Sequence, residues 1–365
     1  MHRIKKIILL ICIPMTLWSQ GIKTSEVDFP ILNGKMTLRG VLSEPNNVQP
    51  DAPLLVLVSP PQPHNRDSGL FKVLSDTLNK HGFVTFRYDN RNFSDTINAK
   101  PNEGRYTMHD GADDLHDVLA FLKSQNRSIG LIGHSEGGSI SIIETARNQD
   151  VQFLLLLATT GTSGEQLALY QYIERMGFLF NRLSPQEINR LKYSIYYPIH
   201  ILANNPNNEV AFSKLRVEAR SFYKENFLSG SFGKMSENKY VETIVEKWTK
   251  DARVLDFLRF NPADYFPTIK CPVFMAYAKD DNLVRWQENK ESLERILMEN
   301  RHLNYYSIAI DSVTHSFEDS GGINFPIFVS VHRRDYSFLP EKGFSKLCKH
   351  IVEWIEDKNV KIPER

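Results

Sequence analysis

One serine lies between two glycines in residues 131–140, LIGHSEGGSI. Gly133, Ser135 and Gly137 have the spacing G-x-S-x-G, and they follow an apolar run and precede a helical pattern. Around such a serine the backbone turns sharply from strand to helix, and the glycines let the two elements approach each other closely. The pattern therefore predicts that Ser135 is an exposed nucleophile rather than a small residue in an ordinary glycine-rich turn.

A serine nucleophile needs a base that takes its proton and a carboxylate that orients the base. The apolar run at residues 273–278 is followed by Asp280 and Asp281, at a strand end, where catalytic groups gather in parallel sheets. Asp281 is the preferred acid because it forms an Asp-x-x-Val pattern with Val284 in the following loop. Asp280 is the alternative candidate for the acid, although it fits better as a cap of the loop before the helix at residues 289–299.

The chain has 11 histidines, and the order of the elements selects among them. His315 lies in the loop after the apolar run at residues 305–310, and the order Ser, Asp, His accompanies this serine motif. His302 precedes that run and His332 follows a further one, so neither is expected at the same edge of the sheet. His134, next to the serine, is expected to be structural. His315 is therefore the predicted base.

These residues need a scaffold of alternating strands and helices. Nearly continuous apolar runs suit strands that are covered on both faces, and helical patterns such as residues 70–81 and 108–122 separate them. Ahead of them, Asn33 and Gly34 form a strong hairpin signal, so the sheet is expected to begin with an antiparallel edge. The sequence thus predicts an α/β fold with a mainly parallel sheet flanked by helices. The predicted strands of the parallel part are residues 54–59, 83–88, 128–133, 153–158, 273–278 and 305–310.

Residues 161–261 interrupt the alternation, because they are helical, rich in aromatic and charged residues, and show no strand pattern. Within them Ser184, Pro185 and Glu187 have the spacing of a capping box at the start of a helix. A helical block inserted between two core strands is expected to cover the strand ends as a lid.

The first residues have the features of a secretory signal peptide. A basic segment, HRIKK, precedes an apolar run at residues 7–18, and Ser19 and Gly21 have the spacing of a cleavage site. A transmembrane anchor is the alternative, but the run falls short of the roughly 20 apolar residues that span a bilayer. A lipid anchor on Cys12 is disfavoured because Ile11 stands where such signals carry a small residue. We expect a secreted or periplasmic protein without a stable membrane anchor. The expected organisation is a signal peptide at residues 1–21, a core at residues 22–160 and 262–365, and a helical lid at residues 161–261.

The composition is that of a globular protein, with 41% hydrophobic and 24% charged residues among 365. A net charge of +1 argues against nucleic acid or an anionic membrane as the main partner, so a small-molecule substrate is expected. No cysteine has metal-ligand spacing, and neither a metal nor another cofactor is predicted. Cys271 and Cys348 could pair in an oxidising compartment, but Cys348 falls on an apolar helical stripe that favours a free buried thiol. The oligomeric state stays open.

Several segments resemble the alpha/beta hydrolases, and among them secreted or periplasmic bacterial serine esterases related to the hydrolase domain of prolyl oligopeptidases. The resemblance covers residues 26–357 outside the helical segment. It implies a serine hydrolase with Ser135 as nucleophile, Asp281 as acid and His315 as base. It also implies that the backbone N–H of Glu136 is one donor of the oxyanion hole. The matching motifs are VSPPQPHNRD, LSDTLNKHGFVTFRYDNRN, GHSEGGS and LRFNPADYFPTIKCPVFMAYAKDD.

Two segments depart from the family pattern. Residues 59–62 read Ser-Pro-Pro-Gln where the family usually has His-Gly-Ser-Gly, and residues 91–94 read Arg-Asn-Phe-Ser where it has Arg-Gly-x-Gly. The first departure puts Pro61, which has no N–H, at or beside the second oxyanion donor. We therefore hypothesise that Gln62 supplies this donor, through its backbone or its side-chain amide.

Hydrolysis of a carboxylic ester through an acyl-enzyme is the leading expectation for the function. A peptidase of the same fold is the nearest alternative, and a binding protein that kept the fold without catalysis is an alternative from another class. Pro60 and Pro61 favour the binding protein, whereas the order of the serine, aspartate and histidine favours the enzyme. The identity of the ester is not predicted.

Overall fold

The computed structural model describes the core of the chain and most of the helical segment. Residues 1–20, which make up nearly all of the expected signal peptide, lie outside the described residues, as do Gln62, residues 92–94 and His332. Among the helices that are described, none has the length and hydropathy needed to span a membrane. The described residues are 21–61, 65–67, 69–91, 106–175, 177, 181, 183–226, 235–320 and 342–357.

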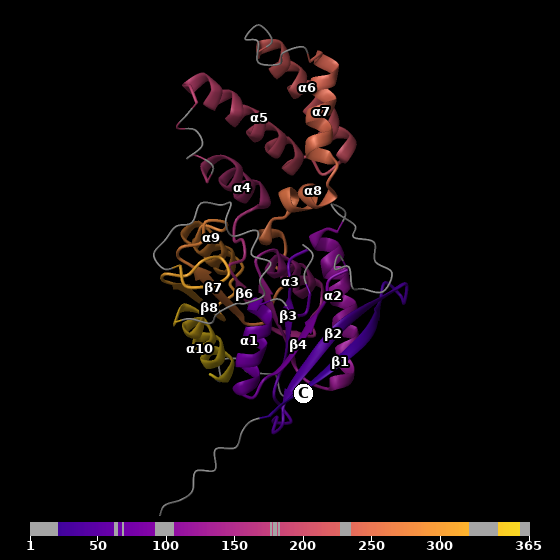
Figure 1. Ribbon diagram of the computed structural model, residues 1–365, viewed down its shortest axis with the longest axis vertical. Coiled ribbons are helices and arrows are strands. Elements are labelled where there is room, and N and C mark those ends of the chain that lie inside the picture. Colours follow the sequence, from indigo (N-terminus) through magenta and orange to yellow (C-terminus); the bar gives the residue numbers. More distant parts are fainter. Residues whose placement is uncertain are drawn as a thin grey trace, which may run out of the picture.

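Eight strands in the described part of the chain form one sheet in the order β1-β2-β4-β3-β5-β6-β7-β8 (Figure 1). β1 and β2 are antiparallel, β2 is antiparallel to β4, and the remaining neighbours are parallel. This arrangement confirms the predicted fold class, a mainly parallel sheet with an antiparallel edge. The strands are β1 (Ile22–Ile31), β2 (Met36–Pro45), β3 (Leu54–Val58), β4 (Val84–Tyr88), β5 (Ile129–His134), β6 (Val151–Leu157), β7 (Val273–Ala278) and β8 (Tyr305–Ile310).

The hairpin between β1 and β2 turns at the Asn-Gly signal. Ile31 pairs with Met36 across the turn, and Asn33 and Gly34 between them have φ values of 55° and 80°. Asparagine and glycine adopt this left-handed backbone more readily than other residues, which is why they mark the reversal.

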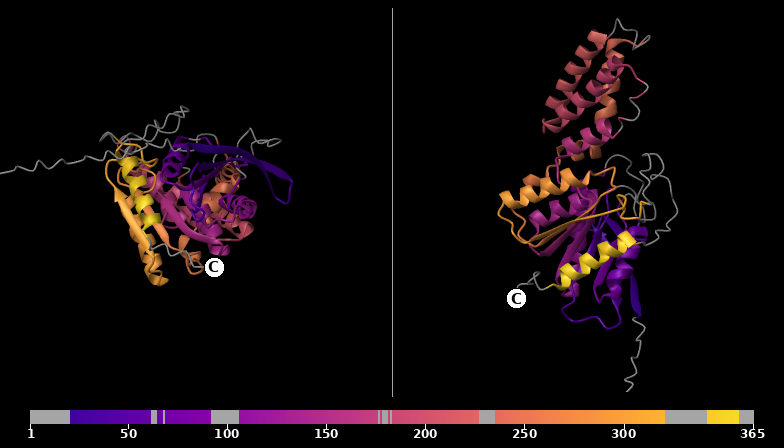
Figure 2. Two further views of the ribbon diagram at one scale, coloured as in Figure 1. Left: turned by 90° about the horizontal axis from the view of Figure 1, so that it is seen from below. Right: turned by 90° about the vertical axis from the view of Figure 1, so that its left-hand side faces the viewer.

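Helices cover both faces of the sheet (Figure 2). Along β3, Leu54, Val56 and Val58 pack in one hydrophobic cluster, while Leu55 and Leu57 pack in the other. This alternation confirms that the continuous apolar runs are strands buried on both faces. The first face is covered by α2 (Met108–Leu122), α3 (Glu136–Arg147) and α9 (Trp286–Glu299), and the second by α1 (Gly69–Lys80) and α10 (Lys342–Glu356).

The two cysteines lie on opposite faces of the sheet and are both free. Cys348 is buried in the cluster under α10, whereas Cys271 packs against the cluster on the other face. Because the sheet lies between the two thiols, Cys271 and Cys348 do not form the disulfide that the sequence left open. Burial raises the pKa of the Cys348 thiol to about 12, as expected for a small apolar core residue.

Between β6 and β7 the described chain is helical, and these helices rise beyond the sheet, with α4 and α8 nearest to the core (Figures 1 and 2). The segment has a hydrophobic cluster of its own, in which Leu202, Leu215 and Trp248 are buried. The predicted capping box is present, because Ser184 Oγ accepts from the N–H of Glu187 at 3.3 Å and the Glu187 carboxylate accepts from the N–H of Ser184 at 2.8 Å. The elements are α4 (Gly164–Leu169), the π-helical turn η2 (Tyr170–Glu174), α5 (Pro185–Ala203), α6 (Asn208–Asn226), α7 (Glu237–Thr249) and α8 (Ala252–Arg259).

Asn289 on α9 anchors the start of this helical segment to the core. Its side chain is 2% exposed, and its Oδ1 accepts from the N–H of Gly161 at 3.0 Å, the N–H of Thr162 at 3.3 Å and the Thr160 hydroxyl at 3.1 Å. A buried side chain that satisfies several backbone donors fixes the direction in which the chain leaves the sheet.

Candidate active site

Ser135 occupies a strained turn between β5 and α3. Its φ and ψ are 56° and −127°, and its N–H donates to Leu157 O on β6 at 2.9 Å. A side chain at Gly133 would place its Cβ 2.5 Å from Gly137 O, so the first glycine permits the approach of strand and helix. A serine with positive φ costs about 1–3 kcal/mol, and such strain is typical of functional turns. The turn therefore has the local structure that the G-x-S-x-G spacing predicts.

The start of α3 lies directly against the end of β3. A Cβ on Gly137 would lie 2.1 Å from Val58 O, which leaves no room for a side chain. The loop after Val58 is fixed in turn by Asn90, whose Nδ2 donates to Pro60 O at 3.0 Å. Because the first N–H groups of a helix have no partner within the helix, the N–H of Glu136 at the start of α3 is a suitable anion donor.

His315 and Asp281 form a hydrogen-bonded pair at the carboxyl ends of β7 and β8. His315 Nδ1 and Asp281 Oδ2 are 2.7 Å apart, and the Asp281 carboxylate is almost fully buried. Asp281 Oδ1 accepts from the N–H groups of Leu283 at 2.7 Å and Val284 at 2.9 Å, so the carboxylate orientation is fixed. A carboxylate only accepts hydrogen bonds, so Nδ1 of His315 carries the hydrogen and Nε2 is left as the basic atom.

Asp280 points to a different partner. Its Oδ2 accepts from the Ser320 hydroxyl at 2.6 Å, and its backbone N–H donates to Val313 O at 3.1 Å. These contacts tie together the loop that follows β8. The structure therefore brings Asp281, and not Asp280, to His315.

His134 connects the serine turn to the histidine loop. Its Nε2 donates to His315 O at 2.9 Å, and the centres of the two imidazole rings are 4.8 Å apart. Ser135 follows His134 directly, so the serine and His315 lie at the same edge of the sheet. No hydrogen bond joins the Ser135 hydroxyl to His315 within the described part of the chain, and this bond is often long or poorly aligned when substrate is absent.

His302 lies at the other end of β7. Its Nε2 donates to Cys271 O at 2.8 Å, and burial lowers the pKa of its imidazole. His302 therefore lies at the amino end of the parallel strands, opposite to the serine turn, as its position before β8 predicts.

Charged residues of the helical segment influence the side chain that follows Ser135. Burial raises the pKa of the Glu136 carboxyl, and the charge of Arg253 on α8 opposes this effect, as does that of His315. Asp251 and Asp256 on the same helix raise it further. The side chain after the candidate nucleophile is therefore within electrostatic reach of both α8 and the candidate base.

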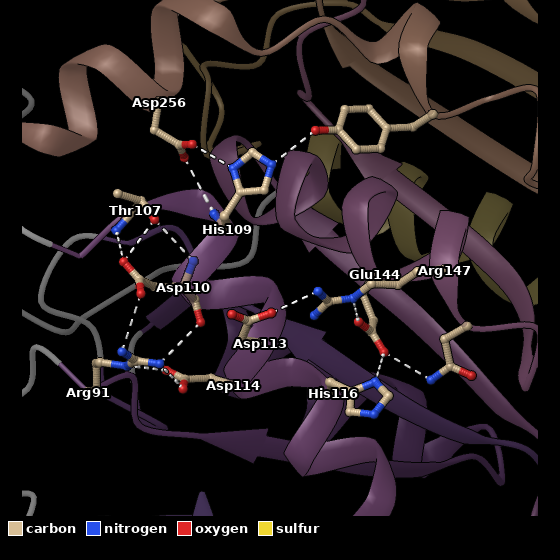
Figure 3. Close-up of polar contacts among 12 residues, drawn as sticks. Arg91, Thr107, His109, Asp110, Asp113, Asp114, His116, Glu144, Arg147 and Asp256 are labelled. Atoms are coloured by element: carbon tan, nitrogen blue, oxygen red, sulfur yellow. Dashed lines mark hydrogen bonds and ion pairs between the residues drawn. The ribbon is translucent and has the colours of Figure 1, made fainter. Parts of the chain in front are cut away.

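Asp256 on α8 also binds the first turn of α2, a contact that the sequence did not reveal (Figure 3). Its carboxylate accepts from the N–H of Met108 at 2.8 Å, and His109 Nδ1 lies 2.5 Å from Asp256 Oδ1. His109 Nε2 faces the Tyr265 hydroxyl at 3.1 Å, and the hydrogen bond to Asp256 raises the pKa of His109. Residues that are 147 positions apart meet here, so no local pattern could predict the pair.

The second segment that departs from the family pattern begins at Arg91. Its Nε donates to the buried carboxylate of Asp114 at 2.8 Å (Figure 3), and Tyr106 OH donates to the same carboxylate at 3.0 Å. Arg91, the one described residue of this segment, is therefore bound to α2.

Comparisons with known proteins give the family and the fold. The sequence profile of the alpha/beta hydrolase family matches residues 57–321, whereas no curated protein matches at a significant level. An esterase of Pyrococcus furiosus is similar in structure, with 15% identity and a TM-score of 0.51 over 92% of this chain and 91% of that chain. Est1E of Butyrivibrio proteoclasticus, solved with ferulic acid, has 12% identity and a TM-score of 0.51 over 91% and 98%. A proline iminopeptidase of Mycobacterium smegmatis has 12% identity and a TM-score of 0.52 over 92% and 99%.

Proposed function

We propose that this chain, which belongs to the alpha/beta hydrolase family, is a serine esterase that works through an acyl-enzyme. The observation that carries the proposal is the 2.7 Å hydrogen bond between His315 and the buried Asp281, at the same edge of the sheet as the strained Ser135. A base oriented by a carboxylate, near a partly exposed serine, is the arrangement that activates a hydroxyl near neutral pH.

In the proposed mechanism, His315 Nε2 takes the proton of Ser135 as Oγ attacks the ester carbonyl. The backbone N–H of Glu136 and a donor from Gln62 stabilise the negative charge on the carbonyl oxygen. The tetrahedral intermediate then releases the alcohol, which receives the proton from His315. Water, deprotonated by His315, attacks the acyl-enzyme and releases the carboxylic acid and the free serine. Asp281 stabilises the imidazolium in both halves of the reaction.

Labelling by a fluorophosphonate probe tests the proposal most directly. Phosphonylation of the mature wild-type chain, and its loss in Ser135→Ala, are the expected results. Hydrolysis of p-nitrophenyl esters compared with peptide amides then separates an esterase from a peptidase. A wild-type chain that neither reacts with the probe nor hydrolyses any ester or amide would indicate a binding protein that kept the fold.

We further propose that residues 161–261 act as a lid and that residues 1–21 direct export and are removed. Two hydrogen bonds support the lid, from Gln171 Nε2 on η2 to Leu283 O and from the N–H of Met108 to the Asp256 carboxylate on α8, because they join the helical segment to the loop after β7 and to the start of α2. Expression with the full N-terminus in a bacterial host, followed by mass measurement of the periplasmic product, tests the export proposal. Cytoplasmic product of full mass would contradict it.

A further inference from the structure

Arg175 follows the π-helical turn η2, and its charge has no counterpart. Its Nε is buried without a hydrogen-bond partner, and its guanidinium forms no ion pair with any residue that the structure describes. Two arginines of α6 do have carboxylate partners, because Arg216 faces Glu242 at 3.0 Å and Arg220 faces Glu237 at 2.9 Å. A partly buried cation without a partner is costly to a fold, and such groups are candidates for ligand binding.

Arg175 belongs to a turn that is held on the loop after β7. Gln171 Nε2 donates to Leu283 O at 3.0 Å, and the N–H of Leu283 donates to the Asp281 carboxylate at 2.7 Å. The backbone N–H of Arg175 closes the π-turn at 2.9 Å, and single π-turns are frequent at functional sites. The unpaired arginine therefore lies on the acid side of the candidate active site.

The Asp281 carboxylate does not neutralise Arg175. Burial lowers the pKa of its guanidinium, and the hydroxyl of Tyr170 and the carboxylate of Asp281 oppose this effect. Asp281, however, already uses one oxygen for two backbone N–H groups and the other for His315. Three of its about four acceptor positions are thus occupied, and among the described residues no ion pair joins it to Arg175, so the arginine is available to an anionic ligand.

We propose that Arg175 binds a carboxylate of the substrate, so that the ester cleaved here carries a free carboxylate in addition to its ester bond. The proposal rests on the esterase function and names its substrate class. A guanidinium matches a carboxylate with two parallel hydrogen bonds, which gives both affinity and orientation. The hydrogen bond from Gln171 Nε2 to Leu283 O holds η2, which precedes Arg175, beside the loop that carries Asp281. The anionic end of the substrate therefore belongs beside η2.

Two pairs of esters that differ by one carboxylate test the proposal. Mono-p-nitrophenyl glutarate and p-nitrophenyl pentanoate differ in the acyl part, and 4-acetoxybenzoate and phenyl acetate differ in the alcohol part. For at least one pair, Arg175→Gln should lower the ratio of kcat/KM for the anionic ester to that for the neutral ester by about 10- to 100-fold. Arg175→Lys should retain most of the ratio because it keeps the charge. An unchanged ratio in both pairs would overturn the proposal.

Binding separates a failure of this proposal from a failure of the esterase function. In the Ser135→Ala background, monomethyl glutarate, 4-acetoxybenzoate or both should bind, as measured by calorimetry, and Arg175→Gln should remove that binding. Arg216→Gln, which removes the same charge from an exposed ion pair between α6 and α7, should leave binding and the kcat/KM ratio unchanged. Binding that depends on Arg175 without any turnover would refute the esterase alone, whereas ester turnover with binding unaffected by Arg175→Gln would refute the carboxylate site alone. An unchanged melting temperature of Arg175→Gln excludes misfolding as the cause.

Discussion

His134 Nε2 donates a hydrogen bond to the backbone oxygen of His315 at 2.9 Å. The residue before the candidate nucleophile thus holds the loop that carries the candidate base. Phe71 and Phe317 meet the His134 ring edge-on at centre distances of 6.5 Å and 6.4 Å, which fixes its orientation. A structural role for His134 was expected from its place beside the serine, and the geometry adds a positioning role.

His134→Leu should lower kcat by about 10-fold with little change in KM, because a small displacement of a catalytic base is costly to the chemical step. His134→Gln should retain more activity, since its side-chain amide can still donate to the carbonyl of His315. Steady-state kinetics with a p-nitrophenyl ester, together with melting temperatures, provide the test. Equal loss in the two variants at equal stability would contradict the positioning role.

Asp281→Asn should reduce kcat by about 10,000-fold, because it leaves the imidazole in the wrong tautomer and its positive charge uncompensated. Asp280→Asn should reduce it less than about 10-fold, since Asp280 contacts Ser320 rather than the histidine. Ser320→Ala is the matched control for the loss of that contact. If Asp280→Asn proved the more severe change, the assignment of the acid to Asp281 would be wrong.

Substitutions of Gln62 distinguish the two possible sources of the second oxyanion donor. If the backbone donates, Gln62→Ala should be mild and Gln62→Pro should lower turnover by about 100- to 1,000-fold, the effect of losing one such donor. If the side chain donates, both substitutions should be severe. Full activity of both variants would show that the second donor lies elsewhere.

The contact between His109 and Asp256 predicts a pH-dependent stability. In the folded state the hydrogen bond to Asp256 raises the pKa of His109 above its ordinary value of 6.5, with a smaller contribution from Asp113 in the same direction and an opposing one from Arg147. The stabilisation by the protonated imidazole is therefore complete below pH 6.5 and is lost as the pH rises through the raised value. The melting temperature of the wild type should exceed that of His109→Gln by more at about pH 5.5 than at about pH 8.5. A difference that does not depend on pH would exclude titration of His109 as its source.

Local patterns in the sequence were enough to predict the scaffold around the serine turn. The apolar run before Ser135 and the helical pattern after it produce β5 and α3, and the glycines allow their close contact. Strand ends can be predicted in this way because a buried strand requires a continuous apolar run, and a turn requires particular backbone conformations. Both requirements are local, so the loops that carry Asp281 and His315 could be located from the sequence.

Only the tertiary structure decided which side chains in these loops meet. Asp280 and Asp281 are adjacent and chemically identical, and the backbone donors of Leu283 and Val284 distinguish them by fixing one carboxylate toward His315. The contact of Asp256 with His109 and the isolation of Arg175 likewise depend on how the helical segment packs on the core. A hydrogen bond or an unpaired charge is a relation between residues that are distant in the chain, so it is determined only when packing sets their separation.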